Sequence, residues 1–223
     1  MTSLRSIAVF WLFLVCVPLH GNTAEVNHAQ EYAKCMALAP SKPDDAFEMA
    51  TIWKGLGGGD AAEHCTAVAL LYSGQPEFAA RRLEVLAETI VAEPEFKGEI
   101  LAQAGQAWLL HGDAPRAEAA FSEAVNLLRG RPVVLVDRAE ARAAMGDYKG
   151  AVEDLTNAIS ADPDLVDAYT FRASAYRYLD EMGKAKADIE AALREAREDA
   201  RIREELRTGI SAASRASLPS RGL

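Results

Sequence analysis

The stretch Ala117-Glu-Ala-Ala-Phe121-Ser-Glu-Ala124 decides the fold, because its spacing recurs twice further along the chain. It returns as Ala151-Val-Glu-Asp-Leu155-Thr-Asn-Ala158 and again as Ala185-Lys-Ala-Asp-Ile189-Glu-Ala-Ala192, each time 34 residues later. Self-similarity at a fixed period of this length is typical of a protein built from stacked helical units. We therefore predict an all-α solenoid in which one unit is used at least three times.

Small and large residues alternate within each unit. A column of small residues holds Gly105, Ala139 and Ala173, and a column of large residues holds Leu101, Leu135 and Tyr169. Two helices approach closely only where neither carries bulk, so these columns predict a packed helix pair. Gly112-Asp113 and Gly146-Asp147 separate the two helices of a unit, since glycine favours the left-handed end of one helix and aspartate caps the next.

With this length and this order of small, aromatic and proline positions, the units resemble tetratricopeptide repeats. The resemblance covers residues 98–199 well and implies a right-handed α-solenoid that binds other proteins. Four residues depart from the family pattern: Arg138 and Arg172 stand where leucine is usual, Arg142 where an aromatic is usual, and Asp180 at the turn glycine. A generic alanine-rich helical bundle is the alternative.

The repeat pattern divides the chain into successive segments. We expect a divergent helix pair at 25–59, a degenerate repeat at 60–97, and regular repeats at 98–131, 132–165 and 166–199. Because Gly74 lies 38 residues before Gly112, the second helix of the degenerate repeat is expected to be about one turn longer than the others. A solvating helix at 200–210 and a frayed tail at 211–223 follow.

The first residues have the features of a secretory signal peptide. Arg5 precedes the apolar run from Ile7 to Val17, which is shorter than the roughly 20 residues that a membrane-spanning helix needs. We predict cleavage after Ala24 and an exported, periplasmic or secreted protein, with an uncleaved membrane anchor as the alternative. Removal of 1–24 removes one arginine and no acidic residue, so the net charge becomes 23 − 33 = −10 with neutral histidines.

The composition argues against several classes of function. An acidic chain without basic clusters is a poor ligand for nucleic acid. No catalytic motif of the serine hydrolase or zinc protease type is present, so we predict no enzyme activity and no cofactor. The cluster Gly55-Leu-Gly-Gly-Gly59 lacks the preceding strand of a phosphate-binding loop; it is expected to stop a helix and form a flexible joint, with Ser41 or Asp44 capping the helix before it and Asp60 the helix after it.

Cys35 and Cys65 are the two cysteines that remain once the signal peptide is removed. An even pair in an exported protein most often forms a disulfide, and both are expected on the first helices of adjacent pairs. His28 and His64 lie near them in the sequence, which leaves a zinc site as the alternative. The spacing lacks the tight ligand pairs of zinc sites, so we predict the disulfide and no metal.

The resemblance implies that first-helix residues form a concave groove for a partner segment. The predicted groove residues are Gln103, Gln106, Leu109, Leu110, Val133, Val136, Asp137, Glu140, Asp167, Thr170, Phe171, Ser174, Arg177 and Tyr178. Repeats that grip a C-terminal carboxylate carry Lys, Arg and Asn at such positions, whereas Asp137 and Asp167 would repel an anion. We expect apolar anchors with a neutral-to-basic flank in the partner. A structural subunit of an envelope assembly, including a homo-oligomer, is the alternative function.

Overall fold

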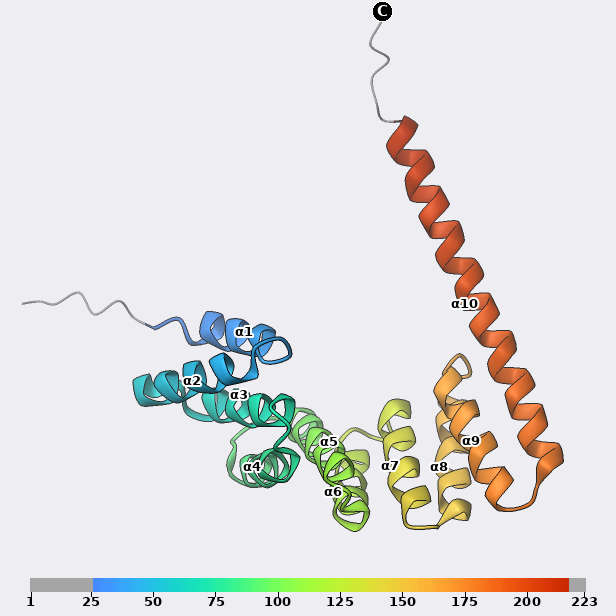
Figure 1. The fold of residues 1–223 in the computed structure, drawn as a ribbon, viewed down its shortest axis with the longest axis horizontal. Coiled ribbons are helices and arrows are strands. Elements are labelled where there is room, and N and C mark those ends of the chain that lie inside the picture. The colour runs from blue at the N-terminus through green and yellow to red at the C-terminus, as the bar shows by residue number, and fades with distance from the viewer. Residues whose placement is uncertain (1–25, 217–223) are drawn as a thin grey trace, which may run out of the picture.

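The computed structural model describes residues 26–216, with side chains described as far as residue 200 except residue 199. Throughout this region the regular elements are helices: α1 (His28–Leu38), α2 (Pro43–Trp53), a π-helical turn η1 (Lys54–Gly58), α3 (Gly59–Tyr72), α4 (Pro76–Thr89), α5 (Pro94–His111), α6 (Ala114–Leu127), α7 (Pro132–Ala144), α8 (Tyr148–Ala161), α9 (Val166–Tyr178) and α10 (Met182–Ala216). Consecutive helices pack against each other and build an open arc (Figure 1). The predicted all-helical solenoid is confirmed.

The small-residue columns let the paired helices approach closely. A Cβ atom on Gly105 of α5 would lie 2.7 Å from the ring of Phe121 on α6, so only glycine fits there without a shift of the ring. Phe121 is fully buried and Leu155, its equivalent one repeat later, is 1% exposed. Ile189 is the third member of this column and is 47% exposed, because no further helix pair of the described residues packs on it.

The turns between paired helices have the predicted capping residues. Gly112 ends α5 in the left-handed conformation at φ 90°, and Gly146 has φ 83°. Asp113 accepts a hydrogen bond from the backbone N–H of Arg116, as Asp147 does from that of Gly150. Asp180 takes the turn position of the last repeat at φ 60°, a conformation that aspartate tolerates better than most residues.

The expectation that the second helix of the degenerate repeat is a turn longer is wrong. Helix α4 has 14 residues, as does α6. The extra residues instead extend the next first helix, since α5 has 18 residues where α7 has 13. Proline is well suited to the first position of a helix, so Pro94 starts α5 before the boundary expected at residue 98.

The glycine cluster stops a helix, as predicted. Leu56 and Gly57 have non-helical backbone angles, with φ 89° at Gly57, so a kink separates α2 from α3. Side-chain capping by Asp60 was also predicted and is wrong, because Gly58 occupies the cap position of α3 without a side-chain bond. Neither Ser41 nor Asp44 caps α2, which starts at Pro43 after Lys42. Proline at the first position presets the helical φ and needs no cap to do so.

Helix α10 joins the last repeat to the C-terminal extension without a break. It continues to Ala216, so the prediction of a frayed tail is wrong for residues 211–216. The predicted signal peptide at 1–24 lies outside the described residues, as does the chain after 216. Within residues 26–216, no helix combines the length and the apolar character required to cross a membrane.

Candidate partner-binding surface

The N-terminal helices are joined by the predicted disulfide. Cys35 of α1 and Cys65 of α3 are bonded, with their Cα atoms 6.2 Å apart and both side chains fully buried. They lie in a small core cluster with Ala46, Ala50 and Val68. The disulfide therefore holds α1 on α3 at the end of the stack, where α1 has few other neighbours.

The histidines near this disulfide have structural hydrogen bonds. The indole N–H of Trp53 donates to Nδ1 of His28 at 2.9 Å. Nδ1 of His64 lies 2.7 Å from the Tyr32 hydroxyl, and its Nε2 lies 2.9 Å from Oε1 of Gln103. Burial of the imidazole lowers the pKa of His64. Among the described residues, no group of three His, Cys, Asp or Glu side chains is placed to hold a metal ion.

The arginines that depart from the repeat pattern pair with carboxylates of the following helix. Arg138 of α7 donates to both oxygens of Asp154 on α8, at 2.9 and 2.6 Å. Arg172 of α9 binds Asp188 on α10 at 2.8 Å through two nitrogens, so the arrangement repeats with the period. These ion pairs belong to the packing of the repeats, since Asp154 is 1% exposed.

The first helices α5, α7 and α9 present one continuous surface, which we call the first-helix face. It carries the exposed predicted groove residues Gln106, Leu110, Val133, Glu140, Asp167, Thr170, Phe171, Arg177 and Tyr178, and the partly buried Gln103, Leu109, Asp137 and Ser174. Val136 was predicted as a groove residue and is 7% exposed, so this prediction is wrong. It faces the core cluster between α7 and α9, where its side chain packs.

A pocket of about 280 Å³ opens between α7 and α9 on the first-helix face. Small side chains, among them Ala139, Ala143 and Ala144, leave the space, and Phe171 and Tyr178 border it. Tyr178 stacks on Tyr148 with the ring centroids 4.4 Å apart and the rings parallel. Glu140 and Ser174 contribute polar groups to the lining. The pocket therefore suits an apolar side chain that has a cationic or hydrogen-bonding neighbour.

A second hollow of about 350 Å³ lies between α5 and α7 and continues the face. Asp137 lies at its edge, where Nε2 of Gln106 donates to its carboxylate at 3.4 Å. Burial raises the pKa of Asp137 to about 6, and the nearby Glu140 adds to the rise. This part of the face therefore gains negative charge as the pH passes from 5 to 7.

Comparison with known proteins identifies the repeats. The sequence model described as tetratricopeptide repeat matches residues 134–165 and 166–199, the helix pairs α7–α8 and α9–α10. Residues 134–199 are tetratricopeptide repeats. The last two repeats of the chain are thus recognised by sequence, although both carry the arginine–aspartate pairs in place of apolar contacts.

Solved structures share the fold of these tetratricopeptide repeats. The crystal structure of MamA is 17% identical, with 79% of this chain and 98% of that chain covered at a TM-score of 0.66. A Podosopora anserina protein described as kinesin light chain-like, with nearly identical TPR-like repeats, is 15% identical, with 78% and 96% covered at a TM-score of 0.67. No curated protein sequence matches. At these identities the likeness shows the fold alone.

Two features of the surface were not predicted from the sequence. Tyr148 starts a second helix and has no equivalent in the other repeats, where Ala114 and Met182 stand, so no column identified it. The other is a groove between α1 and α2, which lies in the divergent part of the chain. Exposed apolar residues at i and i+4, Ile52 and Leu56, are the one sequence signal that could have located it.

Proposed function

We propose that this protein is a non-enzymatic scaffold that holds a segment of a partner protein along the first-helix face. The pocket between α7 and α9 carries the proposal, because it combines small side chains at its base with the stacked rings of Tyr148 and Tyr178. Exposed aromatic anchors beside a polar rim are where interfaces concentrate their binding energy. Proteins with tetratricopeptide folds generally act as scaffolds of this kind.

The charges of the face set the chemistry of the segment. Asp137, Glu140 and Asp167 lie along α7 and α9, and Arg177 is the basic residue among the predicted groove residues. An anionic C-terminus would be repelled by these carboxylates, whereas a neutral-to-basic flank would be attracted. The segment is therefore apolar at its anchors and uncharged or basic beside them.

We also propose that the scaffold works outside the cytoplasm, in the cell envelope or beyond it. The basic start, the short apolar run and Ala24 of the N-terminal sequence support export with cleavage near Glu25. A disulfide between Cys35 and Cys65 fits an oxidising compartment. N-terminal sequencing of the protein recovered from cells tests this; recovery of intact Met1 in the membrane fraction would contradict it.

Crosslinked affinity capture followed by mass spectrometry tests the scaffold function. Leu109 packs partly against the core, so it is left unchanged. The double variant is L110S/Y178S, which changes side chains that are 70% and 68% exposed. We expect it to lose the main captured partner while melting and helicity stay nearly unchanged. The matched control is F78S, which removes an aromatic ring that is 60% exposed on α4.

A structural subunit is the second candidate, favoured by the uncovered end of the stack. Ile189 and Leu193 of α10 are 47% and 52% exposed where a further repeat would pack. If capture survives L110S/Y178S and fails when Leu193 becomes serine, the partner is held at the end of the stack and the scaffold proposal is replaced.

A further inference from the structure

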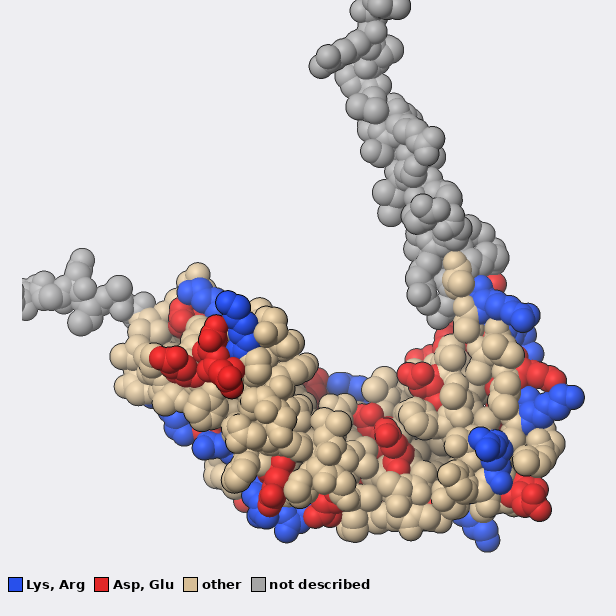
Figure 2. All heavy atoms as spheres, viewed as in Figure 1, with Lys and Arg blue, Asp and Glu red and all other residues tan. Residues whose placement is uncertain are grey.

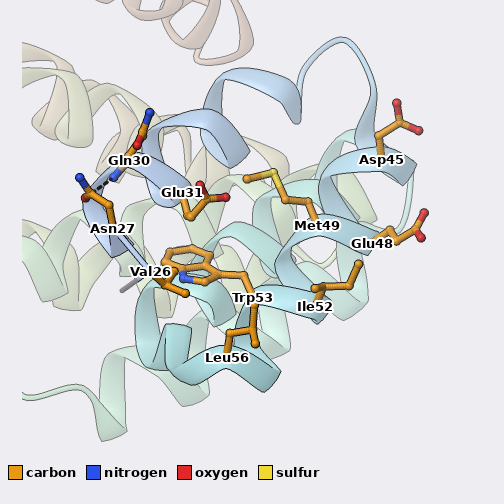
Figure 3. A pocket seen from close by; sticks show the side chains of 10 residues that line it. All are labelled: Val26, Asn27, Gln30, Glu31, Asp45, Glu48, Met49, Ile52, Trp53 and Leu56. Carbon is orange, nitrogen blue, oxygen red and sulfur yellow. Dashed lines mark hydrogen bonds between the residues drawn. The ribbon is translucent and has the colours of Figure 1, made fainter. Parts of the chain in front are cut away.

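A groove of about 610 Å³ lies between α1 and α2 (Figure 3), at the opposite end of the arc from α10 (Figure 1). Met49, Ile52 and Trp53 of α2 and Leu56 of η1 supply its apolar side, and Val26 closes it near Trp53. Ile52 and Leu56 are each 59% exposed. Among the described residues, α1 and α2 are the first helix pair, and no other described helix covers the groove. We call it the cap groove.

The polar groups around the cap groove are acidic. Glu31, Asp45 and Glu48 line it, and no lysine or arginine of the described chain does. Lys34 pairs with Glu31, and Nζ of Lys42 lies 3.7 Å from a carboxylate oxygen of Asp45. No ion pair of Glu48 is found among the described residues. Figure 2 shows acidic side chains over α1 and α2 at this end of the molecule, with basic side chains beside them. The groove therefore suits a helix with one apolar side and basic flanks.

The C-terminal end of this same chain has that composition. Residues 206–223 contain Arg207, Arg215 and Arg221 and no acidic residue, although the whole chain has a net charge of −9. Leu206 and Ile210 are four residues apart, and Ala213 follows at the next turn. The backbone is helical as far as Ala216. An apolar i, i+4, i+7 pattern is how an amphipathic helix enters a groove.

We propose that the C-terminal segment 206–223 of one copy docks in the cap groove of a second copy. The 35 residues of α10 span about 52 Å at 1.5 Å per residue, and the helix leads away from the repeats, far from α1 of its own chain (Figure 1). Its end is thus presented to another molecule. The contact joins two different surfaces, so two copies can exchange their segments reciprocally, or successive copies can form a ring or an open filament.

Charge reversal with rescue tests the pairing, using protein expressed from the complete 223-residue sequence. Light scattering and sedimentation over a wide range of concentration should show self-association. D45K/E48K in the groove and R207E/R215E in the C-terminal segment should each weaken it about ten-fold or more at low salt. The combined four-fold variant should recover most of the loss, because opposite charges face each other again.

Two controls separate the pairing from changes in folding or net charge. D44K reverses one charge in the first turn of α2 without lining the groove, which is half the charge change of D45K/E48K, and R197E reverses one charge of α10 before the C-terminal segment. Both should leave association nearly unchanged. A labelled peptide of residues 206–223 should bind the unchanged protein and bind D45K/E48K at least about ten-fold more weakly.

Three results would overturn the proposal. One is a chain that stays monomeric at every concentration, even if the peptide binds, since the occupant is then another segment or the chain's own end. Another is association that persists in D45K/E48K, which points to contacts along α10 instead. The third is failure of the combined variant to recover association although each double variant folds.

Discussion

Arg138 and Asp154 form a bidentate ion pair between the two helices of one repeat, at 2.9 and 2.6 Å. The guanidinium also donates to Ser122 of the preceding repeat at 3.2 Å. The equivalent Arg172 binds Asp188 in the same way and donates to Thr156 at 3.1 Å. One arginine thus ties its own repeat to the one before it, in a position where the repeat family usually places leucine.

Removal of one partner of this pair should cost more than removal of both. D154A removes the carboxylate that Arg138 and Arg142 both contact and leaves Arg138 with Ser122 as its acceptor in a largely buried site, so we expect a loss of about 3 to 5 kcal/mol in unfolding free energy. R138L/D154A restores the apolar contact that the family uses and that Ala104 and Ala120 approximate in the preceding repeat. It should lose clearly less than D154A. Denaturant titration of both variants decides this, and equal losses would contradict it.

The two glycines Gly105 and Gly183 should respond to alanine in opposite directions. At Gly105 a Cβ would meet the Phe121 ring at 2.7 Å, so G105A should lower the unfolding free energy by about 1 to 3 kcal/mol. At Gly183, in the first turn of α10, a Cβ would have nothing within 4 Å. G183A should raise stability by up to about 1 kcal/mol, because alanine favours helix. Thermal melting of the two variants provides the comparison.

Reduction of Cys35–Cys65 should loosen the N-terminal end of the stack. The bond closes a separation of 30 residues, which corresponds to about 3 to 4 kcal/mol on the chain-entropy estimate. With reductant, hydrogen exchange should speed up in α1 and α2 well before it does in α7 and α8. C35A/C65A should show the same fast exchange with or without reductant. Uniform protection throughout would mean that packing alone holds α1.

Asp137 makes stability fall as the pH rises. Its folded pKa is raised to about 6, so the protonated form is the one favoured by folding, and this contribution is present below the ordinary pKa of aspartate and is lost as the pH passes through 6. D137N should therefore melt higher than the unchanged protein at pH 7.5, by the equivalent of about 1 kcal/mol. The difference should shrink towards pH 4. A constant difference over this range would assign the effect to another cause.

The sequence predicted the regular parts of this fold because they depend on local geometry. The 34-residue spacing of Ala117, Ala151 and Ala185 identified the helix pairs, and Gly112 and Gly146 located the turns. The disulfide was predicted from Cys35 and Cys65 because both fall on neighbouring first helices. Where the pattern was weak, between α4 and α5, the predicted helix boundaries were wrong.

The candidate surface was predicted less well, because periodicity does not orient single side chains. Leu110, Phe171 and Tyr178 are exposed, whereas Val136 from the same set of positions is buried. The difference depends on the orientation of α9 relative to α7, which the contacts between the helices set. The spacing of residues in the sequence does not give this orientation.

By itself, then, the sequence determined the repeated unit, its turns and its cysteine pair. The spacing of residues along a helix fixes which small and large side chains share a face, whatever the helix packs against. Only the tertiary structure decided that Arg138 and Arg172 replace leucine by reaching Asp154 and Asp188 on the next helix. It also decided that Tyr148 stacks on Tyr178 and that α1 and α2 leave a groove uncovered. These features arise where side chains distant in sequence meet, and the crossing of the helices fixes which of them do.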